Sequence, residues 1–140
     1  MIPFPALALG LAGLIPFVYA AAATLAPTLE IGALPRGSVF EVYGVVILAF
    51  MAGCLWGFAA KDGERLWMRL GLSVIPAILI FFAVLWFGGA LIVILMVAFP
   101  ALLLVDFALA RGGAAPAWWM RLRALLTSVV TLCLAIGAFA

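Results

Sequence analysis

Asp106 is the residue whose type and position first suggest chemistry. It stands near one end of an apolar stretch, five residues before Arg111, and a carboxylate inside a membrane is a functional candidate by default. The sequence has no His, and its only other acid bordering an apolar stretch is Glu41, so a proton relay has no obvious partner. We expect Asp106 to reach the lipid headgroup level and to pair with Arg111, Arg69 or Arg121.

The segment 116–123 combines two tryptophans with two arginines. Trp118 suits a membrane–water interface, and Arg121 and Arg123 can bind lipid phosphates or the carboxylates of a partner protein. Arg65, in another basic loop, is a further candidate contact of this kind. Generic anchoring of the last apolar stretch also explains the segment, so both interpretations stay open.

The sequence offers no pair of a nucleophile and a base. The hydroxyl residues of the apolar stretches have no His to activate them. We expect these hydroxyls to bond their own helix backbone or a neighbouring helix; they are Ser73, Thr127, Ser128 and Thr131. The lack of His also removes the commonest metal and haem ligand. We therefore predict neither an enzyme nor a metal site.

The composition indicates that lipid is the main solvent of this chain. Of its 140 residues, 71% are hydrophobic and 9% are charged, whereas soluble domains are about 45–50% apolar and about 25% charged. No basic run or nucleic-acid motif is present, which argues against a nucleic-acid partner. Cys54 and Cys133 form no metal pattern and are interpreted as small buried hydrophobes.

Five apolar stretches each approach the ~20 residues that a helix needs to cross a bilayer. The first has no preceding Lys or Arg and is too long for the core of a secretory signal, so we interpret it as a span. The sequence thus predicts an all-α membrane protein, with one transmembrane domain over residues 1–140. The spans of this five-helix bundle are expected at 5–26, 42–60, 70–87, 90–109 and 122–140.

Prolines and glycines predict local bends. Pro16 should kink the first span, and Gly88-Gly89 predicts a tight turn between the third and fourth. Pro76 and Pro100 lie at similar distances from that turn. Bending at both would open a small gap between the two helices, although prolines of membrane helices are often simply tolerated.

Basic residues predict the orientation. Five spans place six of the seven on the side of the amino terminus, which is therefore expected in the cytoplasm, with the carboxyl terminus on the opposite side. The six are Lys61, Arg65, Arg69, Arg111, Arg121 and Arg123. On the other side, the loop 27–41 contains Glu30, Arg36 and Glu41, which we expect to be solvated, and its prolines and glycines argue against one continuous helix.

The second predicted span has a small residue at every fourth position. Ala49, Gly53 and Gly57 would lie on one helix face beside Trp56, and in lipid this spacing lets two helices approach closely. The face is a candidate docking surface for another protein. Packing within the chain's own bundle is the simpler interpretation.

Several segments together resemble an uncharacterised bacterial membrane family, domain of unknown function 3429, which is related to mitochondrial transmembrane protein 69. They are LGLAGLIPF at 9–17, YGVVILAF at 43–50 followed by Gly53 and Trp56-Gly57, and LVD at 104–106 followed by PAWWMRLR at 116–123. Leu55 stands where the family pattern usually has His. The resemblance implies a five-span inner-membrane protein and brings no activity.

These observations favour a non-catalytic accessory, assembly or stabilising subunit of a larger bacterial inner-membrane complex, either respiratory or photosynthetic. The expected partners are membrane lipids and other integral membrane proteins. The alternative is a small transporter with a path along Pro76, Pro100 and Asp106, or a protein that binds a lipid, quinone or carotenoid. No cofactor is predicted, but such an apolar ligand would need few polar contacts.

Overall fold

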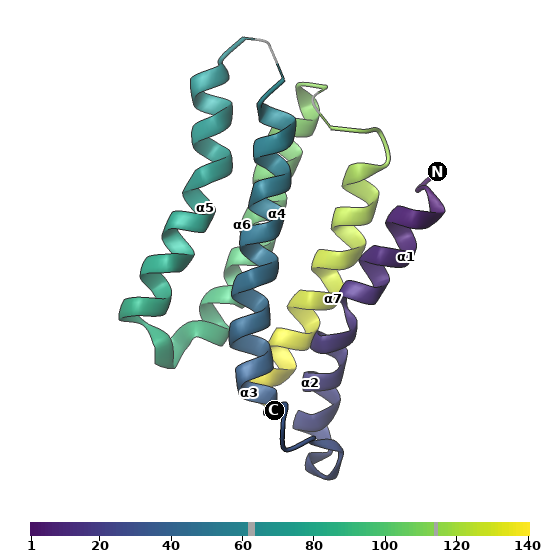
Figure 1. The fold of residues 1–140 in the computed structure, drawn as a ribbon, viewed down its shortest axis with the longest axis vertical. Coiled ribbons are helices and arrows are strands. Elements are labelled where there is room, and N and C mark those ends of the chain that lie inside the picture. The colour runs from purple at the N-terminus through teal and green to yellow at the C-terminus, as the bar shows by residue number, and fades with distance from the viewer. Residues whose placement is uncertain (62–63, 114) are drawn as a thin grey trace.

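Five helical segments run the length of the molecule in the computed structural model, which describes residues 1–61, 64–113 and 115–140 (Figure 1). Each is long and apolar enough to cross a membrane. They are Phe4–Leu25, Arg36–Ala59, Leu66–Trp86, Gly88–Arg111 and Trp119–Phe139. Helices suit lipid because they satisfy their own backbone groups. The predicted all-α fold with five spans is confirmed.

The spans divide into shorter elements. The first comprises α1 (Phe4–Gly13) and α2 (Ile15–Leu25); the second comprises α3 (Arg36–Ser38), the π-turn η2 (Val39–Tyr43) and α4 (Gly44–Ala59). The others are α5 (Leu66–Trp86), the 3₁₀ turn η3 (Gly88–Ala90) with α6 (Leu91–Arg111), and α7 (Trp119–Phe139), while η1 (Pro27–Leu29) lies in a loop. The second, third and fifth spans begin before the predicted 42, 70 and 122, because a helix can continue beyond the hydrocarbon core.

Pro16 interrupts the first span, as predicted. Proline has no backbone N–H, so the helix loses a hydrogen bond, and the chain divides into α1 and α2 at Leu14. Beside this break, the Tyr43 hydroxyl donates a 2.9 Å hydrogen bond to the Gly13 carbonyl oxygen. Tyr43 therefore fastens the second span to the kink of the first.

The turn predicted at Gly88-Gly89 is present as η3, but α5 packs mainly on α4 and less on α6, the helix that follows it. A groove of about 530 Å³ lies between α4, α5 and α6, lined by Pro76, Val97 and Ala101 among others. A groove thus lies beside Pro76, whereas a gap opened by bending at the two prolines stays a prediction. Pro100 lies within α6 and is not among the residues lining this groove.

The core follows the helix period. The buried residues of α6 recur at every third or fourth position, as one inward stripe requires: Leu91, Leu95, Phe99, Leu102, Asp106 and Leu109. Helix α7 packs against α6 and α2 within the bundle (Figure 1). At the centre, the Phe17 ring meets Phe99 edge-on, with ring centroids 6.0 Å apart, and Tyr43 at 5.2 Å.

The loop between the first two spans is held by side chains. The Tyr19 hydroxyl accepts a 2.9 Å hydrogen bond from the Ile31 backbone N–H and donates a 2.7 Å bond to the Leu34 carbonyl. Glu30 accepts the Arg36 backbone N–H at 2.9 Å and also forms an ion pair with the Arg36 side chain. The prediction that Glu30 and Arg36 are merely solvated is therefore wrong: they close this loop and start α3.

Gly137 marks a close approach of α7 to the second span. A Cβ atom at this position would lie 2.5 to 2.9 Å from atoms of the Phe40 ring, and Phe40 is 1% exposed. The ring is buried, so an added methyl group requires it to shift toward the hollow of about 380 Å³ that Phe40 and Gly137 both border. Gly71 on α5 provides a contrast, since a Cβ there would meet nothing within 4 Å.

We expect Gly137→Ala to lower the free energy of unfolding by about 1–3 kcal/mol through overpacking against Phe40. The matched change Gly71→Ala should be neutral or stabilising by up to about 1 kcal/mol, because alanine favours a helix and the space is open. Reversible unfolding of both variants in mixed micelles, followed by circular dichroism, measures the difference. Equal stability of the two would contradict this packing.

Candidate functional site

The Asp106 side chain lies buried inside the bundle, between α6 and α7. It is 1% exposed. Oδ2 accepts a 2.7 Å hydrogen bond from Nε of Arg123, and Oδ1 accepts a 2.9 Å bond from Nε1 of Trp119. Both donors come from α7, whereas the carboxylate comes from α6. We call Asp106, Trp119 and Arg123 the polar cluster.

The ion pair differs from the predicted one: Asp106 pairs with Arg123 and not with Arg69, Arg111 or Arg121. The Arg69 guanidinium instead donates a 3.2 Å hydrogen bond to the Phe58 carbonyl near the end of α4. Arg111, although only five residues from Asp106, is exposed at the end of α6.

Helical phase explains why Arg123 and not Arg121 reaches the carboxylate. Two positions that are two residues apart on an α-helix point about 200° apart. Arg123 shares the inward face of α7 with Thr127 and Val130, whereas Arg121 is exposed. Only the arginine in phase with the core can meet a buried acid on α6.

Aromatic side chains seal the polar cluster. Phe58 of α4 packs edge-on against Trp119, with ring centroids 4.8 Å apart, and Trp118 contacts Trp119 at 6.2 Å. Burial of two charges carries a desolvation cost that good geometry and further hydrogen bonds must offset. The carboxylate has a donor at each oxygen, but Nη2 of Arg123 is buried and finds no partner in the part of the chain that the structure describes.

A cavity of about 250 Å³ lies beside Arg123. It is bordered by the first span, α4, α6 and α7 and is open on one side, and its lining includes Gly13, Phe17, Met51, Phe99, Arg123 and Thr127. Two of these side chains are polar, and both are nearly inaccessible: Arg123 is 2% exposed and Thr127 is 3% exposed. The cavity is therefore apolar except on its α7 side.

The hydroxyls of the spans fall into two groups. Ser73 and Ser128 each donate a 2.7 Å hydrogen bond to a carbonyl of their own helix, as predicted. The prediction is wrong for Thr127 and Thr131, whose Oγ1 atoms are buried and have no partner in the described ranges. Thr127 lines the cavity beside Arg123, and Thr131 does not.

The small-residue face of α4 points away from the bundle. Gly53 and Gly57 are exposed, and a Cβ at either would meet nothing within 4 Å. Trp56 beside them is 46% exposed, while Ala49 is partly covered. Packing of Gly53 and Gly57 within the chain's own bundle, the simpler of the two interpretations, is therefore wrong.

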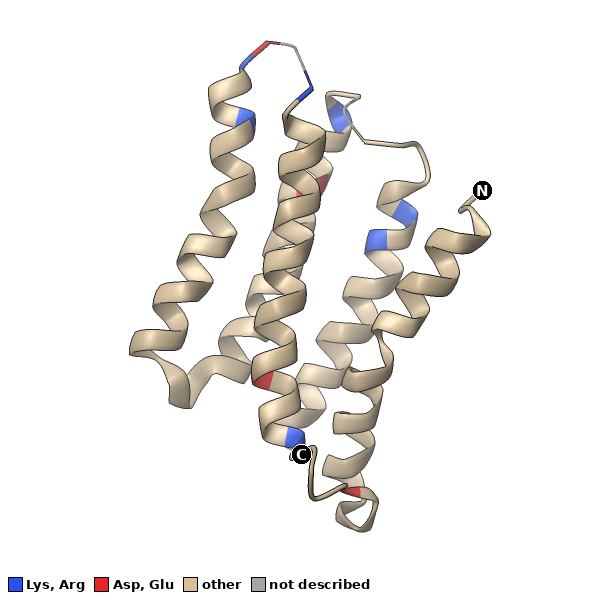
Figure 2. Ribbon diagram, in the orientation of Figure 1, with Lys and Arg blue, Asp and Glu red and all other residues tan. Residues whose placement is uncertain are grey.

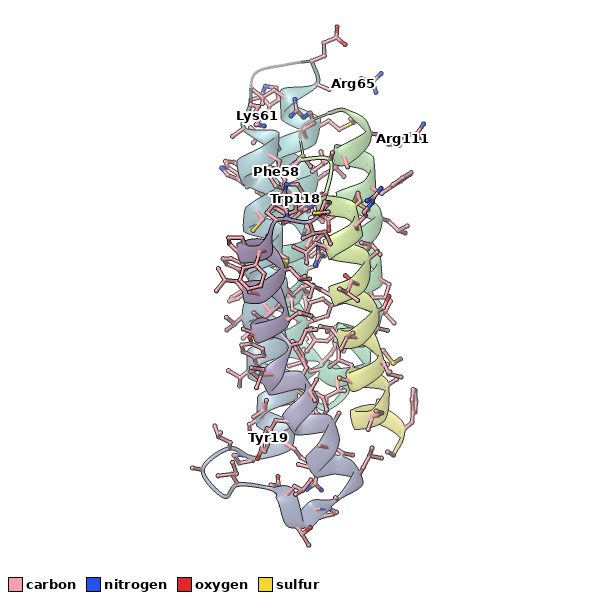
Figure 3. The ribbon with its side chains drawn as sticks, turned by 90° about the vertical axis from the view of Figure 1, so that its right-hand side faces the viewer. Tyr19, Phe58, Lys61, Arg65, Arg111 and Trp118 are labelled. Atoms are coloured by element: carbon pink, nitrogen blue, oxygen red, sulfur yellow. The ribbon has the colours of Figure 1, made fainter. Side chains whose placement is uncertain are left out.

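Basic side chains gather toward one end of the bundle (Figure 2). Lys61, Arg65 and Arg111 lie near this end, with Trp118 somewhat below them (Figure 3). Arg65 borders a polar groove of about 490 Å³ between the start of α5 and the end of α6. The charge pattern predicted that these residues gather on the side of the amino terminus, and the chain begins near the same end (Figure 2). Lipid or partner contacts of Arg65, Trp118, Arg121 and Arg123 stay predictions.

Three further positions have apolar surroundings. Cys133 is buried and Cys54 is half-buried, and both are free thiols. Leu55, at the position where the family pattern usually has His, is 1% exposed and belongs to the hydrophobic core.

The polar cluster was missed because it joins residues distant in sequence. Arg123 lies 17 residues after Asp106, and proximity along the chain favoured Arg111. The available signal was helical phase: Asp106 continues the spacing of Phe99 and Leu102 on α6, and Arg123 that of Thr127 on α7. Matching the inward phases of the two helices would have selected this pair.

Comparisons with known proteins agree with the resemblance seen in the sequence. Residues 2–139 match the model of a family described as "Protein of unknown function (DUF3429)". Transmembrane protein 69 of Xenopus tropicalis is 36% identical over 136 residues, which cover 94% of this chain and 53% of that protein. The chain thus spans about half the length of this relative. No solved structure matches the chain.

We expect Arg123→Leu to lower the free energy of unfolding by about 3–5 kcal/mol, because Asp106 would stay buried without its countercharge. The double variant Asp106→Leu/Arg123→Leu should recover most of this loss, since apolar replacement of a buried ion pair is often neutral. Both are measured by reversible unfolding in mixed micelles.

The exposed neighbour supplies the control for this prediction. Arg121→Leu should change the stability by no more than about 0.5 kcal/mol. If Arg121→Leu costs as much as Arg123→Leu, or if the double variant is no more stable than Arg123→Leu alone, the ion pair does not have the role assigned to it.

Proposed function

Since the chain belongs to the DUF3429 family, to which no activity is attached, we propose its function from its surfaces: a non-catalytic accessory, assembly or stabilising subunit of a larger membrane complex. The observation that carries the proposal is the bare glycine face of α4, where Gly53 and Gly57 are exposed and a Cβ at either would meet nothing within 4 Å in the described part of the chain. We define this docking face as Ala49, Gly53, Trp56 and Gly57.

The energetics of glycine support a partner at this face. A glycine inside a helix costs about 1 kcal/mol relative to alanine, and neither Gly53 nor Gly57 gains a close contact within the chain in return. Lipid fills such a notch poorly, whereas another helix can approach closely and gain van der Waals contact along its length. The exposed Trp56 borders the notch and would extend that contact.

The large uncovered helix surfaces fit the same function. Only 17% of the apolar stretch of α5 is buried inside the chain. The apolar groove beside Pro76 opens next to it. We propose that the host is a respiratory or photosynthetic complex of a bacterial inner membrane. Such a complex supplies transmembrane helices as the occupants of the docking face and of the groove beside Pro76, neither of which includes Gly71.

The transport alternative finds less support. Pro76 lines the groove between α4, α5 and α6, whereas Asp106 is bonded to α7 and neutralised by Arg123. The residues expected to line one polar path thus lie in two different parts of the bundle. Transport would need an accessible polar route through the bundle. A buried carboxylate that is already paired with an arginine does not provide one.

We expect Gly53→Leu to detach the protein from its host complex without unfolding it, because the added side chain has open space within the chain but blocks a close helix approach. The measurement is native electrophoresis and mass spectrometry after gentle detergent extraction from the native membrane. Wild-type protein should migrate with partner subunits, well above its own 14.7 kDa, and Gly53→Leu should migrate alone.

Gly71→Leu is the matched control, because it makes the same change at another open glycine, on α5. It should leave the complex intact. A wild-type protein that always migrates as a free monomer would overturn the proposal, and so would a Gly53→Leu protein that stays in the complex.

A further inference from the structure

We propose that the cavity beside Arg123 binds the ring of an isoprenoid quinone, with the tail of the quinone leaving between α1 and α4 into the bilayer. The proposal rests on the unpartnered polar atoms of α7 and is independent of the docking face of α4. Failure of one proposal therefore leaves the other standing.

The first observation is a pair of unsatisfied groups in the wall of the cavity. Nη2 of Arg123 and Oγ1 of Thr127 are both buried without a hydrogen-bond partner in the described ranges, and both residues line the cavity. They lie one helical turn apart on the same face of α7. Neither atom is accessible from the cavity in this conformation, so the proposal requires the Arg123 and Thr127 side chains to turn toward it. A ligand oxygen bonded there would recover the about 1–3 kcal/mol that an unpaired buried donor costs.

The charge of the site selects a neutral ligand. The Arg123 guanidinium is already paired with Asp106 through Nε, so the polar cluster has no net charge to neutralise an anion. An additional phosphate or carboxylate would have to be desolvated without a countercharge. A carbonyl oxygen accepts hydrogen bonds without this cost, and a quinone ring carries two such oxygens.

The walls of the cavity suit a flat ring. Phe17 and Phe99 stand edge-on to each other at 6.0 Å in its lining, and Met51 adds a polarizable sulfur. Aromatic and methionine side chains pack favourably on ring systems. The volume of about 250 Å³ far exceeds the ~30 Å³ of one water molecule, so a six-membered ring with small substituents fits where a single water would not fill the space.

The edge of the cavity gives a route for an apolar tail. Its lining ends at Leu9 of α1 and Phe50 of α4, which are 75% and 62% exposed on the lipid-facing surface. Arg123 lies four residues, or about 6 Å, beyond the start of α7 at Trp119. The polar wall is thus about one helical turn from the end of this span, and the open side of the cavity is apolar.

Titration of the purified protein in micelles with decylubiquinone tests the proposal. Quinones quench tryptophan fluorescence, and Trp119 is bonded to the same carboxylate as Arg123. We expect saturable quenching. Thr127→Val, which removes one hydroxyl at constant shape, should weaken binding about tenfold, the effect of losing one hydrogen bond to a buried acceptor. Arg123→Lys keeps the charge beside Asp106 but removes Nη2, and should weaken binding at least as much.

Thr131→Val is the matched control, since the Thr131 Oγ1 atom is also buried and has no partner among the described residues, but Thr131 does not line the cavity. Its affinity for decylubiquinone should equal that of the wild type. Non-saturable quenching, or equal affinities of Thr127→Val and Thr131→Val, would overturn the proposal. Displacement of decylubiquinone by dioleoylphosphatidylcholine at equal mole fraction would also overturn it, because the cavity would then accept lipid ester carbonyls and not select a quinone.

Discussion

The ion pair between Asp106 and Arg123 is the interaction on which the arrangement of α6 and α7 depends. Two charges inside a membrane bundle are tolerable only when they meet with good geometry and are shielded together. Here both carboxylate oxygens have donors, and Trp119 supplies the second one. The polar cluster therefore favours the rotation of α7 that turns Arg123 inward, the same rotation that buries its apolar residues Leu122, Val130 and Leu134.

That rotation has consequences along the whole of α7. It turns Arg121 outward, and it brings Thr127 inward beside the cavity. Nη2 of Arg123 has no partner among the described residues, while the second carboxylate oxygen is bonded by Trp119. Apolar replacement of such a pair is often neutral for stability. In the proposed quinone site, the unpartnered Nη2 would connect the ion pair to ligand binding.

Hydropathy predicted the five spans correctly because lipid imposes a length and a composition on every crossing helix. It did not predict side-chain partners. Lipid-facing and core-facing positions are equally apolar, so hydropathy does not distinguish them. The mean hydropathy of a span therefore could not show that Gly53 faces outward or that Thr127 faces inward. For Asp106, the nearest arginine in sequence was the wrong choice, and helical phase, a geometric quantity, was the right guide.

The two proposals place different tasks on opposite sides of the same helix. The inward side of α4 contributes Met51 to the cavity and Leu55 to the core, while its outward side presents Gly53 and Gly57. A helix docked on the outward side would restrict the separation of α1 and α4, which border the opening of the cavity at Leu9 and Phe50. Docking and ligand entry would then be coupled through α4, since whatever fixes its position also sets the width of the opening.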